Sequence, residues 1–265
     1  MFLELLVSVF FIFIGIEIRT TLTHLKQVAL PAISALGGMV FPAAIFLVLS
    51  HDNQAWAATM PTDIALALGV VALLGKGFSP AVRIFLLTLA VADDLFSLII
   101  LGIFYSDQLD LTHAAATLGS AAFGIALASL PKFPAQPLIN WLAPVITFGV
   151  IPIYVIAKLS EGISVSALTS HTTWSFIVAR IFGKVIGITL FAYVASSFRI
   201  PLSIEIKHVA GIGWLSGIGM TVSLVIADVA LTTESSLAEV RAGLIAGALI
   251  STAISFLWFK RFPAS

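Results

Sequence analysis

The chain has 265 residues, of which 60% are hydrophobic and 10% are charged, and its formal net charge is +0. Soluble globular proteins carry roughly 25% charged residues, so this composition excludes an ordinary soluble domain and indicates a protein that crosses a membrane several times. The balance of 13 basic and 13 acidic residues provides no basic block for nucleic acid, and the absence of cysteine excludes disulfides and thiolate metal sites.

Nine apolar segments, taken in chain order, are long enough or nearly long enough to cross about 30 Å of hydrocarbon as helices. We therefore predict an all-α polytopic membrane protein with about nine transmembrane helices. No soluble domain or long linker fits between the segments, so residues 1–265 are expected to form a single membrane domain. The predicted spans are 1–18, 28–49, 56–75, 81–105, 112–130, 138–157, 174–196, 207–231 and 238–258.

Basic residues alternate between the loops of this predicted topology. Lysine and arginine favour the cytoplasmic side of a membrane, so the alternation places the N-terminus outside and the C-terminus inside. Lys158 is the one exception. The basic residues that set the orientation are Arg19, Lys26, Lys76, Arg83, Lys132, Arg199, Lys207, Lys260 and Arg261.

Four ionisable residues lie near the centres of predicted spans. Asp93 and Asp94, within LAVADDLFSL, are in the middle of the fourth span, Lys184 is in the middle of the seventh, and Asp63 is near the middle of the third. One charge at the bilayer centre costs roughly 2.5–3.5 kcal/mol on insertion scales. The arrangement becomes tolerable if the groups pair, hold a cation or line water.

Any one of these residues, taken alone, is also explained as a structural hydrogen-bonding or ion-pairing group. Four at a common depth favour a shared polar site, and carboxylate oxygens suit hard cations such as Na⁺, and protons. Adjacent residues point about 100° apart on a helix. One of Asp93 and Asp94 can therefore face a cation while the other meets a partner such as Lys184.

Two spans carry signals of an interrupted helix. In the third span Pro61 removes a backbone donor and is followed at once by Thr62 and Asp63. The eighth span has four glycines within nine residues. A simple kink at Pro61 and a small-residue packing face in the eighth span are the alternatives. The four glycines are Gly211, Gly213, Gly217 and Gly219.

Paired interrupted helices in corresponding positions of two halves are typical of transporter sites. Here each interrupted span is the middle member of a three-span unit, so we predict inverted repeat units at residues 28–105 and 174–258. Asp63 is placed to offset the positive ends of the broken helices, and Lys184 the negative ends.

Several stretches resemble the NhaA-type sodium/proton antiporter family, in the same order and over most of the chain. They are FFIFIGIEIR, ISALGGMVFPA, ATMPTDIALALGVVALLG, FLLTLAVADDLFSLIILGIFY, FGKVIGITLF and GIGWLSGIGMTVSLVIA. The resemblance implies an inverted repeat with two crossing, unwound helices. It also implies electrogenic exchange of Na⁺ or Li⁺ for two protons across a bacterial inner membrane, with no resident cofactor and a homodimer as one form of assembly. In such a membrane the N-terminus that the loop charges place outside is periplasmic, and the C-terminus is cytoplasmic.

The same resemblance implies roles for individual residues. Asp94 corresponds to the principal cation- and proton-binding carboxylate, and Asp93 to its neighbour, which pairs with the lysine matching Lys184. Thr62 and Asp63 correspond to the unwound-helix pair, and Asp63 shapes the surroundings of a transiently bound Na⁺.

Three departures from the family pattern stand out. The chain lacks the family's first helix, and it has only PKFPAQP where the family carries two further helices between the fifth and sixth spans. Arg180 lies four residues before Lys184, on the same helical face. These departures bear on transport activity, pH regulation and dimer formation more than on the fold.

Two acidic residues nearer the span ends are open to two readings each. Glu17 is either part of an acidic cytoplasmic mouth or a solvated interfacial charge, and the latter is the preferred interpretation. Asp228, near the outer end of the eighth span, is interpreted as interfacial.

The leading hypothesis is a secondary antiporter, which is not an enzyme. The alternative is a shortened, transport-defective homologue with a structural or regulatory role in the membrane, motivated by the missing helices. An intramembrane aspartyl protease is disfavoured, because GIG is followed by Met220 where that class requires an aspartate.

Overall fold

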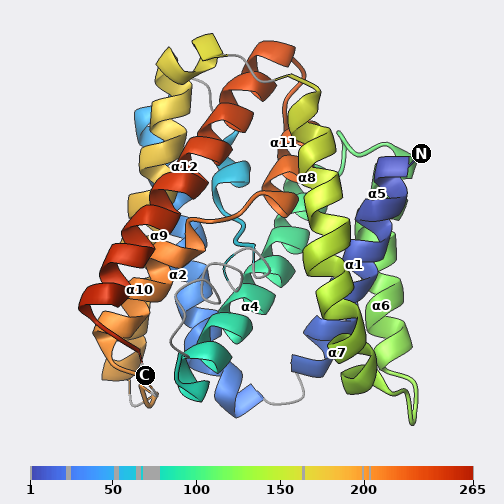
Figure 1. The fold of residues 1–265 in the computed structure, drawn as a ribbon. Coiled ribbons are helices and arrows are strands. Elements are labelled where there is room, and N and C mark those ends of the chain that lie inside the picture. Colours follow the sequence, from blue (N-terminus) through green and yellow to red (C-terminus); the bar gives the residue numbers. More distant parts are fainter. Residues whose placement is uncertain are drawn as a thin grey trace.

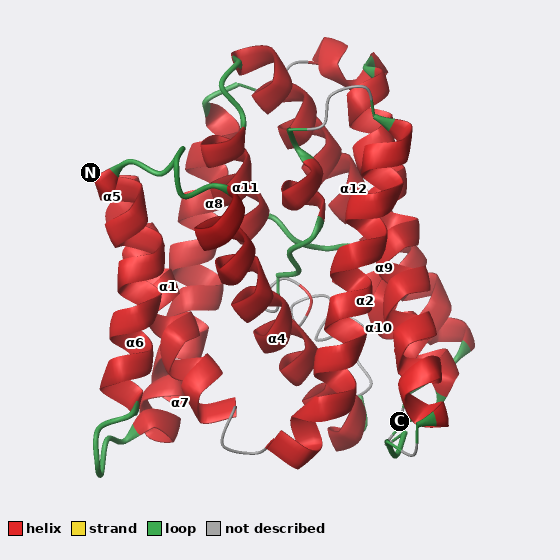
Figure 2. Ribbon diagram, turned by 180° about the vertical axis from the view of Figure 1, so that it is seen from behind, coloured by secondary structure: helices red, strands yellow, loops and turns green. Residues whose placement is uncertain are grey.

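The computed structural model describes residues 2–21, 25–50, 54–63, 67, 78–162, 165–198, 200–202 and 204–264. Within these ranges all regular secondary structure is helical, and no strand occurs (Figure 2). The predicted all-α fold class is therefore confirmed.

The helices form a bundle, and the chain ends marked N and C lie toward opposite ends of it (Figure 1). In chain order the elements are α1 (Phe2–Thr21), α2 (Leu25–Leu49), η2 (Trp56–Thr59), α4 (Pro80–Phe104), α5 (Leu111–Ala114), η3 (Ala115–Gly119), α6 (Ser120–Ala128), α7 (Ala135–Val145), η4 (Ile146–Val150), α8 (Ile151–Ser160), η5 (Val165–Thr169), α9 (His171–Ser197), α10 (Ile206–Ser216), α11 (Thr221–Ala230) and α12 (Glu234–Arg261).

Multiple crossing of a membrane is supported by helix length and composition. Six helical stretches of the described chain are long and apolar enough to span, and the bent pair of α10 and α11 makes up to seven. α1 coincides with the first predicted span, although its 20 residues include Glu4, Glu17 and Arg19. The third predicted span falls mostly outside the described residues. The polytopic class is confirmed, and the number of nine spans stays a prediction.

The helix boundaries follow the apolar segments of the sequence. α4, α9 and α12 begin and end within four residues of the fourth, seventh and ninth predicted spans. The fifth and sixth predicted spans each contain a π-helical turn, η3 and η4. Pro144 lies inside α7 just before η4, and it has no N–H to donate to the preceding turn, which gives the local irregularity a cause.

The bundle has two groups of helices with α4 and α11 between them (Figures 1 and 2). In one group α1 packs against α6, α7 and α8. In the other, α9 packs against α2, α10 and α12. Two cavities lie along the boundary between these groups, where α1 and α8 face α4 and α11.

Glycines let two helix pairs approach to backbone contact. A Cβ on Gly15 of α1 would meet the carbonyl of Ala121 in α6. Between α2 and α9, a Cβ on Gly37 would meet the carbonyl of Gly187, and a Cβ on Gly187 would meet the carbonyl of Gly37. Small residues at such points allow dense packing of helices in lipid. α9 is thereby fixed against α2.

The eighth predicted span is an interrupted helix, as the sequence indicated. α10 ends at Ser216, α11 begins at Thr221, and the two are bent by 51° across the break. In the third predicted span η2 ends at Thr59, and residues 60–63 have no regular structure. The second half of that span lies mostly outside the described residues, so its conformation stays a prediction.

Candidate functional site

The two interrupted segments lie against each other in the interior of the protein. The backbone N–H of Asp63 donates to the carbonyl of Ile218 at 3.0 Å. The hydroxyl of Thr62 donates to the carbonyl of Ser216 at 3.2 Å. Residues 60–63 and 217–220 thus form one contact, which we call the crossing.

Asp63 occupies the N-terminal end of α11. Its Oδ2 accepts hydrogen bonds from the Thr221 hydroxyl at 2.6 Å, from the Thr221 N–H at 3.0 Å and from the Met220 N–H at 3.4 Å. The first N–H groups of a helix lack partners within the helix and carry partial positive charge. The Asp63 carboxylate therefore accepts hydrogen bonds from the free N–H groups at the start of α11, although it belongs to the opposite segment. This confirms the prediction that Asp63 offsets the positive end of a broken helix.

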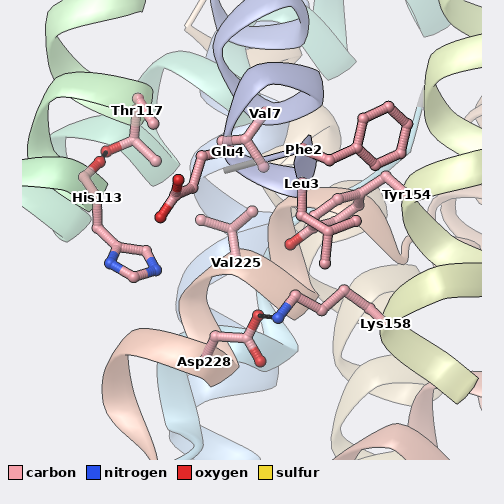
Figure 3. A pocket seen from close by; sticks show the side chains of 11 residues that line it. Phe2, Leu3, Glu4, Val7, His113, Thr117, Tyr154, Lys158, Val225 and Asp228 are labelled. Atoms are coloured by element: carbon pink, nitrogen blue, oxygen red, sulfur yellow. Dashed lines mark hydrogen bonds and ion pairs between the residues drawn. The ribbon is translucent and has the colours of Figure 1, made fainter. Parts of the chain in front are cut away.

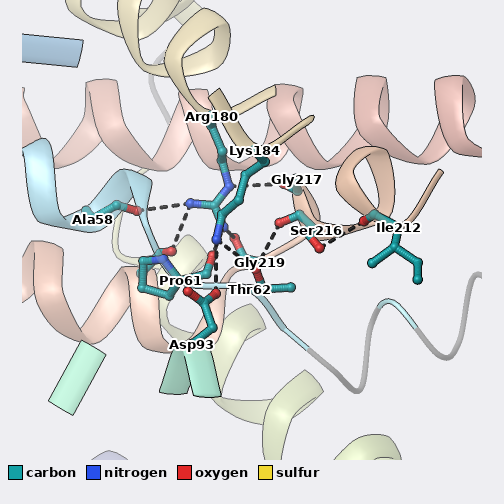
Figure 4. Close-up of polar contacts among 11 residues, drawn as sticks. Ala58, Pro61, Thr62, Asp93, Arg180, Lys184, Ile212, Ser216, Gly217 and Gly219 are labelled. Carbon is teal, nitrogen blue, oxygen red and sulfur yellow. Dashed lines mark hydrogen bonds and ion pairs between the residues drawn. The ribbon is translucent and has the colours of Figure 1, made fainter. Parts of the chain in front are cut away.

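Lys184 and Asp93 form a buried ion pair. The Lys184 ammonium donates to Asp93 Oδ2 at 3.0 Å and to the Thr62 hydroxyl oxygen at 2.8 Å, and each side chain of the pair is 1% exposed (Figure 4). The lysine on α9 thus joins α4 to the segment that precedes Asp63. Asp93 is the member of the aspartate doublet that meets the lysine.

Arg180 lies one turn before Lys184 on α9, and its role at the interrupted segments was not predicted from the sequence. Its guanidinium is fully buried and contacts backbone carbonyls of both interrupted segments (Figure 4). Lys184 was the predicted cation for those carbonyl ends, and this prediction is wrong: Arg180 binds the carbonyls, whereas Lys184 binds Asp93 and Thr62. The available signal was a second basic residue in an apolar span, on the same face as Lys184.

Asp94 faces a different environment from its neighbour. It lines a cavity of about 80 Å³ together with Thr62, Asp63 and Glu17, enclosed by side chains from α1, α4, α7, η4 and the start of α8. Its Oδ1 is buried and has no hydrogen-bond partner among the described residues. A buried polar atom without a partner is costly, so Asp94 gains by taking up a proton or a cation. A cavity of this volume has room for a few water molecules or a partly hydrated ion.

Glu17 of α1 belongs to this cavity. The residue is only partly exposed and lines the same cavity as Asp94. The cavity position makes Glu17 less solvated than its preferred interpretation assumed, and its depth in the membrane stays a prediction. Of the two readings of Glu17, the acidic lining of an entrance is the one that fits its position.

A second cavity, of about 270 Å³, lies further along the same boundary, toward the N-terminus of α1 (Figure 3). Glu4, Tyr154, Lys158 and Asp228 are among its lining residues. Lys158 of α8 and Asp228 of α11 form an ion pair at 3.0 Å, with side chains 18% and 15% exposed. Asp228 is therefore paired and largely buried near the end of α11, and its position at the membrane interface stays a prediction.

The same ion-pair group explains the exception in the loop charges. Lys158 also contacts Glu161 at 3.2 Å, and Arg241 of α12 contacts Glu161 at 2.9 Å. The charge of Lys158 is thus balanced by acidic partners that lie next to it.

Asp110 caps the start of α5, beside the same cavity. Hydrogen bonds from the backbone N–H of His113 and then from its ring lower the pKa of Asp110.

We expect Asp228→Asn to lower the free energy of unfolding by about 1–2 kcal/mol, between the values typical of exposed and of fully buried pairs. The reason is that Lys158 loses its charged partner across the boundary between α8 and α11. Unfolding of Asp228→Asn, Lys158→Met and the double variant in detergent micelles gives a double-mutant cycle. Strictly additive effects would contradict a direct interaction between the two side chains.

No group of three or more histidine, aspartate and glutamate side chains in the described ranges has the geometry of a resident metal site. The fold and the buried polar centre define a polytopic helical membrane protein whose interrupted segments meet beside ionisable side chains. This class of arrangement is the one in which membrane transporters bind ions.

Comparison with known proteins gives the family. The sequence profile of the family described as Na+/H+ antiporter 1 matches residues 1–133 and 115–259. The chain is 29% identical to the Na(+)/H(+) antiporter NhaA of Salmonella paratyphi B (strain ATCC BAA-1250 / SPB7), over 97% of this chain and 82% of the relative. It is 30% identical to the Na(+)/H(+) antiporter NhaA of Actinobacillus pleuropneumoniae serotype 3 (strain JL03), over 96% of this chain and 80% of the relative.

The chain therefore belongs to the Na+/H+ antiporter 1 family. The alignment with the Salmonella relative extends over 321 residues, more than the 265 residues of this chain. The relative consequently contains internal segments that this chain lacks, in agreement with the predicted shortening.

Proposed function

We propose that the chain is a secondary active antiporter that exchanges Na⁺, or Li⁺, for protons across the bacterial inner membrane. It acts as a transporter and not as an enzyme, and the ions are its cargo. The observation that carries the proposal is the unpartnered Oδ1 of Asp94 in a cavity beside the crossing. Membership of the Na+/H+ antiporter 1 family supports the choice of ions.

Asp94 is the principal carboxylate in this proposal. A deprotonated Asp94 binds Na⁺, with Asp63 and the Thr62 hydroxyl lining the same cavity. A proton that reaches Asp94 from the other side of the membrane competes for the same oxygens and releases the cation. Asp93 holds Lys184 at 3.0 Å and can exchange that partner for the cation during the cycle.

The proposed organisation follows from the pairing of equivalent elements. α2 and α9, the first helices of the two proposed repeat units, pack against each other, and the two interrupted segments also meet. This is the arrangement expected of inverted repeats at residues 28–105 and 174–258. A periplasmic N-terminus, a cytoplasmic C-terminus and assembly as a homodimer in the lipid bilayer belong to the same proposal.

The test is Na⁺-driven proton movement by the purified protein in proteoliposomes. Vesicles with an acidic interior and a pH-sensitive dye are given NaCl, LiCl or KCl. We expect NaCl and LiCl to dissipate the pH gradient in a protein-dependent manner. A response no larger than that of protein-free vesicles would reject exchange and favour the transport-defective alternative.

A further inference from the structure

Arg180 uses every hydrogen-bond donor that a guanidinium has. The group carries five N–H donors. Nε donates to the carbonyl of Gly217 at 3.0 Å, and the two terminal nitrogens supply the other four hydrogen bonds. Their acceptors are the carbonyls of Ala58 at 3.0 Å, Pro61 at 2.6 Å and Gly219 at 2.8 Å, and the hydroxyl of Ser223 at 3.0 Å.

These acceptors come from both interrupted segments. Ala58 and Pro61 belong to the stretch that leads into Thr62, whereas Gly217 and Gly219 belong to the break between α10 and α11. A helix that stops inside a protein leaves carbonyls without partners and with partial negative charge. Arg180 thus supplies at one point the positive charge and the donors that both breaks need.

Gly219 shows how closely the guanidinium is held. A Cβ on Gly219 would collide with a terminal nitrogen of Arg180 and would lie 2.6 Å from the carbonyl oxygen of Pro61. Glycine at this position is therefore required for the guanidinium to reach between the two segments.

Lys184 makes a different set of contacts from the same helix face. Its two hydrogen bonds go to side-chain oxygens, those of Asp93 and Thr62, and not to the carbonyls of the crossing. A carboxylate that loses its cationic partner can take up a proton, whereas a backbone carbonyl cannot be neutralised. A guanidinium keeps its charge under physiological conditions, while a buried ammonium can release its proton.

We propose that Arg180 is a positioning residue: it is the fixed cation that holds the crossing together and so places Thr62 and Asp63, which leaves the charge of Lys184 unnecessary for the fold. The part of this inference that concerns Na⁺ binding rests on the proposed antiport. The part that concerns the fold is independent of it.

The structural part is tested by thermal unfolding in detergent. Arg180→Gln leaves several buried carbonyls without donors, so we expect its midpoint to fall by at least about 10 °C. We expect Lys184→Gln to change the midpoint by less than about 5 °C, because Asp93 can be protonated or accept from the amide. A fall for Lys184→Gln as large as that of Arg180→Gln, or purification of Arg180→Gln but not of Lys184→Gln, overturns the proposal.

A milder variant tests the positioning of the cation site. Ser223→Ala removes one of the five acceptors of Arg180 and leaves both charges in place. We expect the KM for Na⁺ to rise about threefold to tenfold with the maximal rate within about twofold, as loss of one buried hydrogen bond implies. The matched control is Ser255→Ala, a buried serine that donates only within α12. Equal KM values for the two serine variants overturn the positioning role.

The proposed antiport and the proposed role of Arg180 can be rejected independently of each other. If the wild type shows no exchange while the thermal midpoints separate as expected, the proposed antiport is wrong and the role of Arg180 in the crossing stands. If exchange is present and the midpoints of Arg180→Gln and Lys184→Gln coincide, the antiport stands and the role of Arg180 is rejected.

Discussion

Replacement of Asp94 with asparagine is expected to lower the rate of Na⁺-driven proton exchange at least about 100-fold, which corresponds to roughly 2.7 kcal/mol of activation free energy. Asparagine has nearly the shape of aspartate but neither the negative charge nor an exchangeable carboxyl proton. Both ions of the proposed cycle therefore lose their common ligand. The measurement is the initial rate of dye response in proteoliposomes after addition of NaCl.

Two controls make this result specific. Asp107→Asn removes a carboxylate from an exposed loop and should leave the rate unchanged. The thermal midpoint of Asp94→Asn should not fall far below that of the wild type, because Oδ1 of Asp94 has no hydrogen bond to lose among the described residues. An Asp94→Asn protein that exchanges ions at the wild-type rate would reject the proposed role of Asp94.

Gly187→Ala is expected to give the largest loss of stability among single-methyl substitutions. The added Cβ would collide with the carbonyl of Gly37, and the clash involves the backbone of α2, which cannot rotate away as a side chain could. Overpacking of a protein interior typically costs 1–3 kcal/mol, occasionally more. We expect at least about 3 kcal/mol here, seen as a fall of about 10 °C in the thermal midpoint.

Gly149→Ala provides the matched control for this prediction. Gly149 lies in η4, and a Cβ there would meet no atom within 4 Å. Alanine is also favoured over glycine inside helices, so the midpoint should stay the same or rise slightly. Similar midpoints for Gly187→Ala and Gly149→Ala would show that α2 and α9 can separate without loss of stability, against the packing described for them.

The helix positions could be read from the sequence because an apolar segment of about twenty residues has few alternatives in a membrane. The ends of α4, α9 and α12 agree with the predicted spans for this reason. The π-helical turns η3 and η4 were not predicted, because the apolar pattern is insensitive to one extra residue in a turn. Pro144, Gly149 and Pro152 were the local hints for η4.

The polar centre was predictable in part. The common depth of the aspartates and Lys184 favoured a shared polar site, and the 100° between adjacent residues predicted that Asp93 and Asp94 could have different surroundings. The assignment of Asp93, and not Asp94, to Lys184 came from the family resemblance. The structure places Asp93 at Lys184 and Asp94 at the cavity. The partners of Arg180 were not predictable, because they are backbone carbonyls that become available only when two remote segments of chain break and meet.

The ion pairs around Lys158 show the same limit. Loop charges are counted one at a time, so a lysine on the outer side looked anomalous in the sequence. Its partner Glu161 is only three residues away in the sequence, at the end of α8. Asp228 lies on α11, and only the packing of α8 against α11 brings it to Lys158.

Two cavities share the helices α1 and α8 as walls, one beside Asp94 and the other beside Asp228. A tilt of this pair of helices about a point between the two cavities would enlarge one space and compress the other, because the cavities lie at different levels along α1. Such a motion would open one end of the boundary while it closed the other, so that the two ends would not be open to water at the same time.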